Sequence, residues 1–280
     1  MRPSVVDKRH TFRTLHESGC FVIPNPWNAG GARYLAGLGF KALATTSSGF
    51  AHAQGYADGA MPLDRVLIHL RDIADAVDLP VNADFEGGYA SAPVDVAHHV
   101  RLCVDTGIAG LSIEDASGDP AKPLFDFDLA VARIRAARRA IDAAGGDVQL
   151  TARSEGFICG LPDLGETIRR LTAFAGAGAD CVYAPGLATR EQIAAVVTAV
   201  APTPVNVLLT AAIRLTVPEL ADLGVRRLST GGGLARVAWT AFAESAREIL
   251  EAGTFSRFAT ALPNADLNAL FRSRPAESRA

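Results

Sequence analysis

The 280-residue sequence has few of the features that mark secreted, membrane or nucleic-acid-binding proteins. Its four cysteines (20, 103, 159 and 181) are scattered, without the spacing of a zinc site, and we expect reduced core residues. No apolar run is long enough to cross a membrane, and residues 1–8 lack the apolar core of a signal peptide. A net charge of -3 provides no basic surface for nucleic acid. We therefore expect a soluble, cytoplasmic protein that binds neither membrane nor nucleic acid.

The sequence does contain a regular alternation of short apolar runs and helix-like segments. A short helix is expected over residues 10–18, and residues 63–77 show helical periodicity at Val66, Leu70 and Ile73. About eight strand-then-helix units follow one another, which is the rhythm of a (β/α)₈ barrel. The expected strands are residues 20–24, 41–46, 79–83, 109–113, 148–152, 180–184, 204–209 and 225–229.

The main rival fold is a doubly wound open sheet. Against it, the first expected strand is not followed by a glycine-rich dinucleotide loop. Because no linker-like stretch interrupts the alternation, we expect one domain over residues 1–280. Its barrel core spans about 10–252, and a C-terminal helix and a polar, mobile tail occupy 253–280.

Acidic residues end the third and fourth expected strands. The apolar run before Asp84 leads into Asp84 and Glu86, one residue apart, and Glu114 ends the next strand. Neighbouring carboxylates at the end of a buried strand need something to offset their desolvation and repulsion. A polar exit from the strand with a helix cap is the alternative. We predict that Asp84, Glu86 and Glu114 bind Mg²⁺, with Mn²⁺ as the alternative ion.

Polar residues gather at the C-terminal strand ends, where barrel enzymes build their active sites. Arg153 offers a planar fork for a carboxylate or phosphonate, the alternative being a structural ion pair with Glu155 or Glu114. Tyr183 is expected to line the pocket rather than to perform acid–base chemistry. Asn206 is expected to bind substrate or to cap its own loop. Together these positions indicate an enzyme with an acid-rich site and one arginine.

Four segments together resemble the isocitrate lyase/phosphoenolpyruvate mutase superfamily. They are Val-Asn-Ala-Asp (81–84), Leu-Ser-Ile-Glu-Asp (111–115), Thr-Ala-Arg-Ser-Glu (151–155) and Gly-Ala-Asp (178–180). The resemblance, from about residue 12 to about 250, implies a (β/α)₈ barrel whose eighth helix is exchanged between subunits of a dimer or a dimer of dimers. It also implies Mg²⁺, a small carboxylate substrate, and cleavage or formation of a C–C or P–C bond next to an enolate.

The resemblance also implies roles for individual residues. Arg153 would hold the substrate carboxylate, helped by hydroxyl or backbone N–H groups of Thr46, Ser47 and Ser48. Asp58 matches an acid near the reacting group. Glu155, Tyr183 and Asn206 complete the predicted substrate contacts.

Two positions depart from the family pattern. Asn82 replaces the first acid of an Asp-x-Asp pair, and Glu86 lies in an apparent insertion before Gly87. The loop 115–124 also lacks the Cys and His of the tricarboxylate lyases, which argues against activity on those substrates. Lys122 is the one cation in this loop and a candidate catalytic residue, the alternative being a solvated lysine.

We therefore expect an Mg²⁺-dependent lyase or decarboxylase that acts on a small 2-oxo or 2-hydroxy (di)carboxylate through an enolate. One alternative is a mutase or hydrolase that acts on the P–C bond of a phosphonate. A second alternative is a barrel that binds a metabolite without catalysis.

Overall fold

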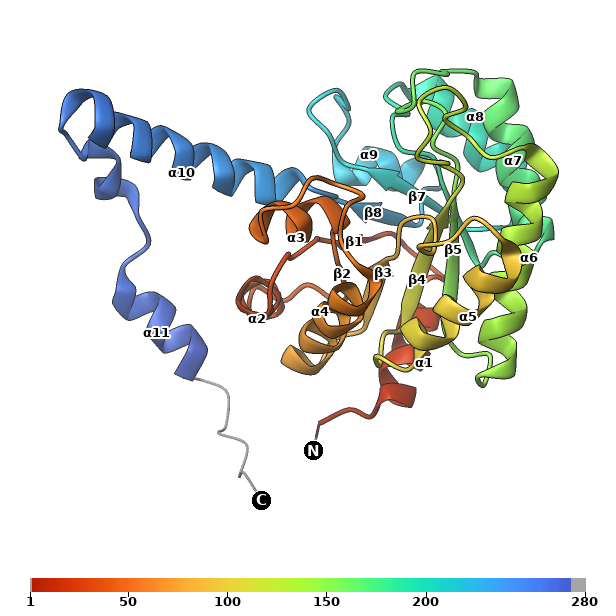
Figure 1. The fold of residues 1–280 in the computed structure, drawn as a ribbon, viewed down its shortest axis with the longest axis horizontal. Helices are drawn as coiled ribbons and strands as arrows, with labels where there is room; N and C mark the ends of the chain where they lie inside the picture. Colours follow the sequence, from red (N-terminus) through yellow and green to blue (C-terminus); the bar gives the residue numbers. More distant parts are fainter. Residues whose placement is uncertain (1, 273–280) are drawn as a thin grey trace.

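Eight parallel strands form a barrel in the computed structural model, which describes residues 2–272 (Figure 1). Hydrogen-bonded neighbours run in the order β1-β8-β7-β6-β5-β4-β3-β2. The Ala44 N–H donates to the Pro24 carbonyl at 3.1 Å, which joins the two outer strands. The predicted (β/α)₈ fold is thus confirmed. The strands are β1 (Phe21–Ile23), β2 (Leu43–Ala44), β3 (Val81–Asp84), β4 (Gly110–Glu114), β5 (Gln149–Arg153), β6 (Cys181–Tyr183), β7 (Val205–Leu208) and β8 (Arg227–Ser229).

Helices surround the strands, and several begin at capping residues. The Asn28 side chain accepts a hydrogen bond from the Gly31 N–H, and Thr189 forms a capping box with Gln192, as expected at helix N-termini. The helices are α1 (Val5–Leu15), α2 (Ala29–Gly37), α3 (Ser47–Ala53), α4 (Leu63–Ala76), α5 (Pro93–Val104), α6 (Phe127–Ala143), α7 (Leu164–Gly176), α8 (Arg190–Val200), α9 (Val217–Asp222), α10 (Gly233–Ala252), η1 (Ser256–Thr260) and α11 (Asn264–Arg272).

The first helix begins earlier than predicted. It starts after Ser4, which forms a capping box with Asp7, and not at residue 10. Two of its buried side chains are cationic: Lys8 donates to backbone carbonyls at the end of α4, and Arg9 donates to the Ile108 carbonyl at 3.0 Å. The apolar periodicity used for the prediction cannot reveal a helix face that packs through charged groups.

The apolar core lies between the barrel and its helices, whereas polar side chains gather inside the barrel toward the C-terminal ends of the strands. Val96, Val100 and Cys103 of α5 are fully buried there. All four cysteines are free thiols; Cys103 and Cys181 are buried, as predicted for core residues, whereas Cys20 and Cys159 are only partly buried. Within residues 2–272, no helix has the length and apolarity needed to cross a membrane.

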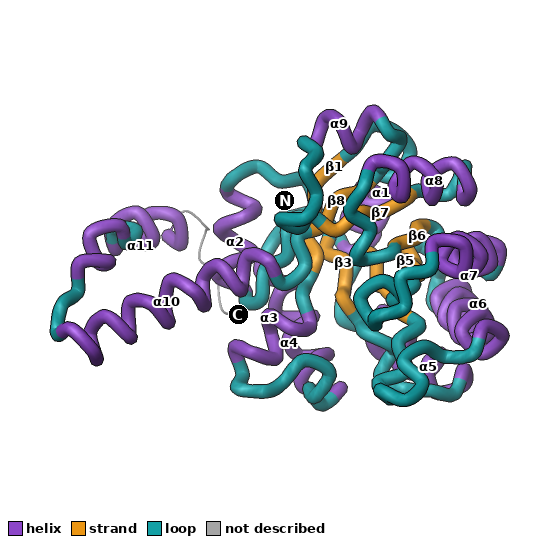
Figure 2. Tube along the Cα trace, turned by 90° about the horizontal axis from the view of Figure 1, so that it is seen from above, coloured by secondary structure: helices purple, strands orange, loops and turns teal. Residues whose placement is uncertain are grey.

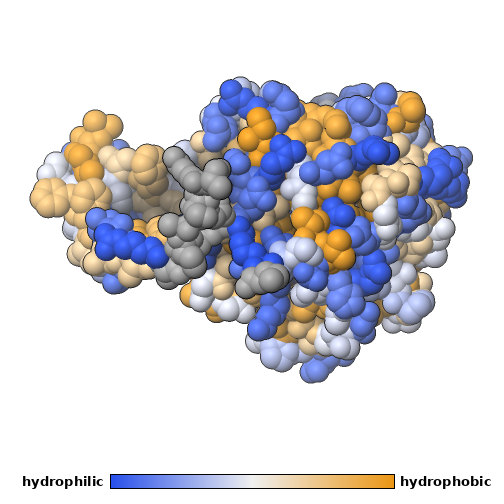
Figure 3. Space-filling view, turned by 90° about the horizontal axis from the view of Figure 1, so that it is seen from below, coloured by the Kyte–Doolittle hydropathy of each residue, from blue (hydrophilic) through white to orange (hydrophobic). Residues whose placement is uncertain are grey.

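Helix α10 leaves the barrel as an extended arm (Figures 1 and 2). Of its 20 residues only Ala235 is buried, whereas Val237, Phe242 and Leu250 are exposed. Apolar side chains gather at the far end of this arm (Figure 3). The chain then returns through α11 to helix α2 of the barrel. There the guanidinium of Arg33, in α2, donates to the carbonyl of Phe271, in α11, at 2.7 Å. Residues 273–280 of the predicted tail lie outside the described residues.

Candidate active site

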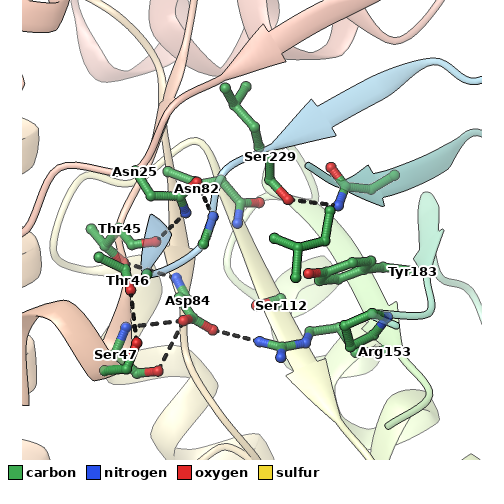
Figure 4. Close-up of a pocket in the computed structure, with 18 of the residues that line it drawn as sticks. Asn25, Thr45, Thr46, Ser47, Asn82, Asp84, Ser112, Arg153, Tyr183 and Ser229 are labelled. Carbon is green, nitrogen blue, oxygen red and sulfur yellow. Dashed lines mark hydrogen bonds and ion pairs between the residues drawn. The ribbon is translucent and has the colours of Figure 1, made fainter. Parts of the chain in front are cut away.

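A cavity of about 160 Å³ opens at the C-terminal ends of the strands (Figure 4). Most of the residues that line it are polar, and they come from strands all around the barrel. The predicted site residues that line it are Thr46, Ser47, Ser48, Asp58, Asp84, Arg153, Tyr183 and Asn206. Glu86, Glu114, Glu155 and Lys122 are not among the lining residues.

Arg153, at the end of β5, is bound by three carboxylates. Its Nη1 lies 2.7 Å from Asp84 Oδ1 and 3.2 Å from Glu114 Oε2, and its Nε donates to Glu155 Oε1 at 2.9 Å. Burial lowers the pKa of Arg153, but the three acids more than reverse this and raise it well above its ordinary value. The guanidinium is therefore permanently charged. The alternative prediction, an ion pair with Glu155 or Glu114, describes the contacts of Arg153 in this structure. Arg153 also lines the cavity, so its guanidinium can still bind a substrate carboxylate as first predicted.

Asp115 holds Glu155 in place behind this cluster. Asp115 Oδ1 accepts from the Glu155 N–H at 2.8 Å, and its Oδ2 accepts from Arg170 Nη1 at 3.0 Å. Glu155 is only 2% exposed. Glu155 therefore orients the guanidinium of Arg153 from the buried side. It would influence a bound substrate through Arg153 and not by direct contact.

Helix α3 was not predicted, yet it carries the half-buried hydroxyls of Ser47 and Ser48 at the cavity. Its first residue, Ser47, donates to Asp84 Oδ2 through both its N–H (3.0 Å) and its hydroxyl (2.9 Å). The Thr46 side chain caps the helix by accepting from the Gly49 N–H at 3.2 Å. A Cβ on Gly49 would meet Thr46 Cγ2 at 2.6 Å, so glycine permits this close approach. A local signal was present in the sequence: Thr46, a capping residue, followed by Ser47, Ser48 and Gly49.

Glu86 turns away from Arg153. Its backbone is left-handed, with φ 46°, and its Oε1 accepts from the Tyr89 hydroxyl at 2.9 Å. Burial, with repulsion from Asp84 and Asp58, raises the pKa of Glu86 to about 7. At the cavity rim, partial burial and Asp84 also raise the pKa of Asp58. The Glu86 carboxyl is therefore readily protonated near neutral pH.

The three predicted metal ligands are not gathered around one point. Asp84 and Glu114 both contact Arg153, and Glu86 contacts Tyr89. Within residues 2–272, no three His, Cys, Asp or Glu side chains converge as ligands of one ion. A metal held by one or two carboxylates, with water and substrate completing its shell, is the arrangement that Mg²⁺ favours.

The charge balance of the site nevertheless fits a divalent cation. Three carboxylates share the single guanidinium of Arg153, and burial with repulsion from neighbouring acids raises the pKa of Glu114 and of Glu155. Asn82 Oδ1, which is buried, lines the cavity without a hydrogen-bond partner among the described residues. A bound cation would offset the excess negative charge and give such an oxygen a partner.

Lys122 lies outside the cavity. Its Nζ pairs with Asp126 Oδ2 at 2.6 Å, and both side chains are more than half exposed. The loop that carries it is held instead by the backbone bridge between Ala116 and Leu124. The structure thus places Lys122 in the surroundings of a solvated lysine, and its catalytic role stays a prediction.

Arg227 forms a polar floor that the sequence interpretation missed. Its guanidinium donates to Asn206 Oδ1 and Thr151 Oγ1, each at 2.9 Å, and contacts His16 Nε2 at 3.3 Å. The Asn206 Nδ2 donates to Ser229 Oγ at 2.9 Å. Burial lowers the pKa of Arg227, whose partners are all uncharged. Two adjacent arginines in an otherwise apolar strand were the available signal. Asn206 is therefore engaged by the protein and does not cap its own loop.

Comparisons with known proteins agree with this geometry. Residues 12–250 match the family model described as phosphoenolpyruvate phosphomutase. A Burkholderia cenocepacia J2315 protein of solved structure is 45% identical, with a TM-score of 0.93 over 97% of each chain. Oxaloacetate acetylhydrolase, solved with its product oxalate, is 27% identical, with a TM-score of 0.84 over 96% of this chain and 95% of the other.

An enzyme of known reaction is also similar in sequence. Oxaloacetate decarboxylase of Paraburkholderia xenovorans (strain LB400) is 30% identical over 208 residues, which are 69% of this chain and 66% of the relative. The resemblance predicted from the strand-end motifs is thereby confirmed. The chain belongs to the phosphoenolpyruvate phosphomutase family, within the isocitrate lyase/phosphoenolpyruvate mutase superfamily.

Proposed function

We propose that this protein is an Mg²⁺-dependent lyase or decarboxylase that acts on a small 2-oxo or 2-hydroxy dicarboxylate through an enolate. The observation that carries the proposal is that Arg153 and Asp84 pair at the wall of a small cavity, with Glu114 bound to Arg153 behind them. The names of relatives that act on oxaloacetate support the same substrate class. The cavity, at about 160 Å³, suits a substrate of only a few carbon atoms.

Arg153 is suited to hold the substrate carboxylate. Its Nε and Nη1 are taken by protein carboxylates, and within residues 2–272 no partner occupies Nη2. The fixed ion pairs orient the guanidinium before substrate arrives, which lowers the entropic cost of binding. The hydroxyls of Thr46 and Ser48, 3.2 Å apart, offer further donors on the opposite wall.

Asp84 and Glu114 are the residues that would hold the metal ion. When bound, Mg²⁺ supplies positive charge that stabilises the oxygen of the developing enolate. The two Ser47 donors fix Asp84 Oδ2, so the carboxylate orientation is set by the start of α3. Asp58 lies at the rim of the same cavity, close enough to Asp84 for the two charges to interact.

The decisive experiment measures CO₂ release from oxaloacetate with Mg²⁺, in EDTA, and after Mg²⁺ or Mn²⁺ is restored. We expect turnover that EDTA abolishes and either ion recovers. Activity unchanged by EDTA would contradict the metal role. Phosphate release from phosphonopyruvate would favour the P–C bond alternative, and tight oxalate binding without turnover of any 2-oxo acid would favour a binding barrel.

A matched pair of variants tests the carboxylate anchor. Arg153→Lys keeps the charge but removes the planar fork, and we expect kcat/KM to fall by about 10²-fold. Arg169→Lys makes the same change at an exposed ion pair with Glu166, outside the cavity, and should leave kcat/KM unchanged. Equal activity in both variants would remove Arg153 from the proposed site.

The projecting helix α10 supports a homo-oligomer in which this helix is exchanged between subunits. Trp239 and Phe242 line an apolar cavity of about 270 Å³ together with Trp27 and Ala53 at the barrel surface. A single chain leaves this surface open to water, and a second copy of the same helix has the apolar residues to cover it.

A further inference from the structure

The cavity lining contains few groups that can deliver a proton. Its titratable residues are Asp58, Asp84, Arg153, Tyr183 and Arg227. Both oxygens of Asp84 accept hydrogen bonds, and the two arginines are permanent cations. Neither a Cys nor a His lines the cavity among the described residues. Asp58 and Tyr183 remain, and only Tyr183 is uncharged under all ordinary conditions.

A buried chain of hydrogen bonds runs from His16 through Arg227 and Asn206 to Ser229. The donor and the acceptor of each bond are determined, because the Phe12 carbonyl can only accept and Arg227 can only donate. The Phe12 carbonyl accepts from His16 Nδ1 at 2.8 Å, so that nitrogen carries the hydrogen and Nε2 is left as an acceptor. Arg227, which can only donate, contacts Nε2 at 3.3 Å and donates to Asn206 Oδ1 at 2.9 Å. The Asn206 amide must then donate to Ser229 Oγ, at 2.9 Å.

Tyr183 lies near Ser229, where this chain ends. Ser229 Oγ already accepts from Asn206, so its own hydrogen is free to be donated. Tyr183 lines the cavity, so its phenol can donate a hydrogen to a ligand bound there (Figure 4). Burial raises the pKa of this phenol, and the nearby Arg153 and Ser229 lower it by less.

We propose that Tyr183 donates the proton that converts the bound enolate into its keto product. This inference rests on the enolate chemistry proposed above. The enolate π electrons form the new C–H bond at the carbon, and the carbonyl re-forms. The Tyr183 O–H bond breaks and leaves a phenolate. Arg153, whose guanidinium carbon lies 5.1 Å from the ring centroid, stabilises that phenolate until water entering the cavity reprotonates it.

The test follows the geometry of protonation. Oxaloacetate with deuterium at one C3 position is turned over in tritiated water with Mg²⁺, and the chirality of the pyruvate methyl group is measured. A donor fixed on one face gives a chiral methyl group. An enolate released into water is protonated from both faces and gives a racemic one. We expect chiral pyruvate from the wild type and racemic pyruvate from Tyr183→Phe.

Matched variants separate this role from a structural one. Tyr34→Phe, an exposed change outside the cavity on α2, should retain chirality. Oxalate binding by Tyr183→Phe should stay within about threefold of wild type. Ser229→Ala, which removes a hydroxyl that lowers the pKa of the phenol, should slow pyruvate formation by about tenfold with chirality retained.

Each result bears on one claim. A wild type that releases no CO₂ from oxaloacetate contradicts the proposed function. A wild type that releases CO₂ but gives racemic pyruvate, or a Tyr183→Phe variant that still gives chiral pyruvate, overturns the role of Tyr183. Loss of chirality in Asp58→Asn but not in Tyr183→Phe assigns the proton to Asp58 and overturns it as well.

Discussion

The buried imidazole of His16 makes the stability of this protein depend on pH. Burial, together with the charge of Arg227, lowers its pKa from 6.5 to about 3. In the unfolded chain His16 is therefore protonated below about pH 6.5, whereas in the folded protein it stays neutral down to about pH 3. His16 stabilises the fold fully above pH 6.5, and this contribution is lost as the pH falls. Between about pH 7.5 and about pH 5 the loss is about 2 kcal/mol of unfolding free energy.

Other groups also titrate as the pH falls over this range, so a variant is needed to isolate His16. Burial lowers the pKa of His69 to about 4, which adds a loss of the same sign. The raised pKa of Glu86, about 7, gives a gain as the pH falls. His16→Gln removes only the contribution of His16, and the amide of the new side chain can still accept a hydrogen bond from Arg227.

Urea unfolding of the wild type and His16→Gln at both pH values measures the effect. We expect the variant to be less stable at pH 7.5 by about 1 kcal/mol, for the weakened bond to Phe12. At pH 5 that difference should shift by about 2 kcal/mol in favour of the variant. His10→Gln, an exposed change on the same helix, serves as the control. A difference between wild type and His16→Gln that is the same at both pH values would refute a neutral, buried His16.

Three further predictions concern the arm and the acids. Phe242→Asp places a charge on the exposed apolar face of α10, and light scattering should show loss of the oligomer; an unchanged mass would argue against helix exchange. Glu86→Gln keeps an acceptor for the Tyr89 hydroxyl but removes a carboxyl with a raised pKa. The ionised carboxyl destabilises the folded protein above about pH 7, and this destabilisation is lost as the pH falls toward 4.5. In EDTA near pH 8 this variant should be about 2–3 kcal/mol more stable than wild type in urea unfolding, and equal stability would contradict the raised pKa. Ser47→Ala removes one of the two donors to Asp84, and kcat/KM for oxaloacetate should fall by about tenfold; full activity would show that the remaining N–H suffices.

The barrel was predictable because its strands and most helices carry strong periodic patterns. Apolar strands such as β4 and β5 end in Glu114 and Arg153, so the polar residues marked one edge of the sheet before their contacts were known. The same logic located Asp84 and the hydroxyls of Thr46 and Ser47 at the cavity. Strand order and polarity were enough for this part of the site.

Other parts depend on contacts that no local pattern encodes. Glu86 belongs to the acidic stretch by sequence, but its left-handed backbone directs it to Tyr89 and away from Arg153. Helix α3 has only seven residues, too few for an amphipathic period. Arg227 becomes part of the site because three neutral partners from different elements meet its guanidinium. These features follow from tertiary packing, which decides where a polar side chain is satisfied.

The closure of the barrel has a consequence for its motions. Seven of the strand junctions carry a parallel ladder, whereas β1 and β2 are joined in the described chain through the Pro24 carbonyl and the Asn25 side chain, which donates to the Thr45 carbonyl at 2.6 Å. Local opening should begin at this junction, and the Ala44 amide should exchange with solvent earlier than amides of β4 or β5. Thr45 lies directly before the hydroxyls of the cavity. A ligand that bridges those hydroxyls and Arg153 should therefore slow the breathing of the barrel as well as occupy its site.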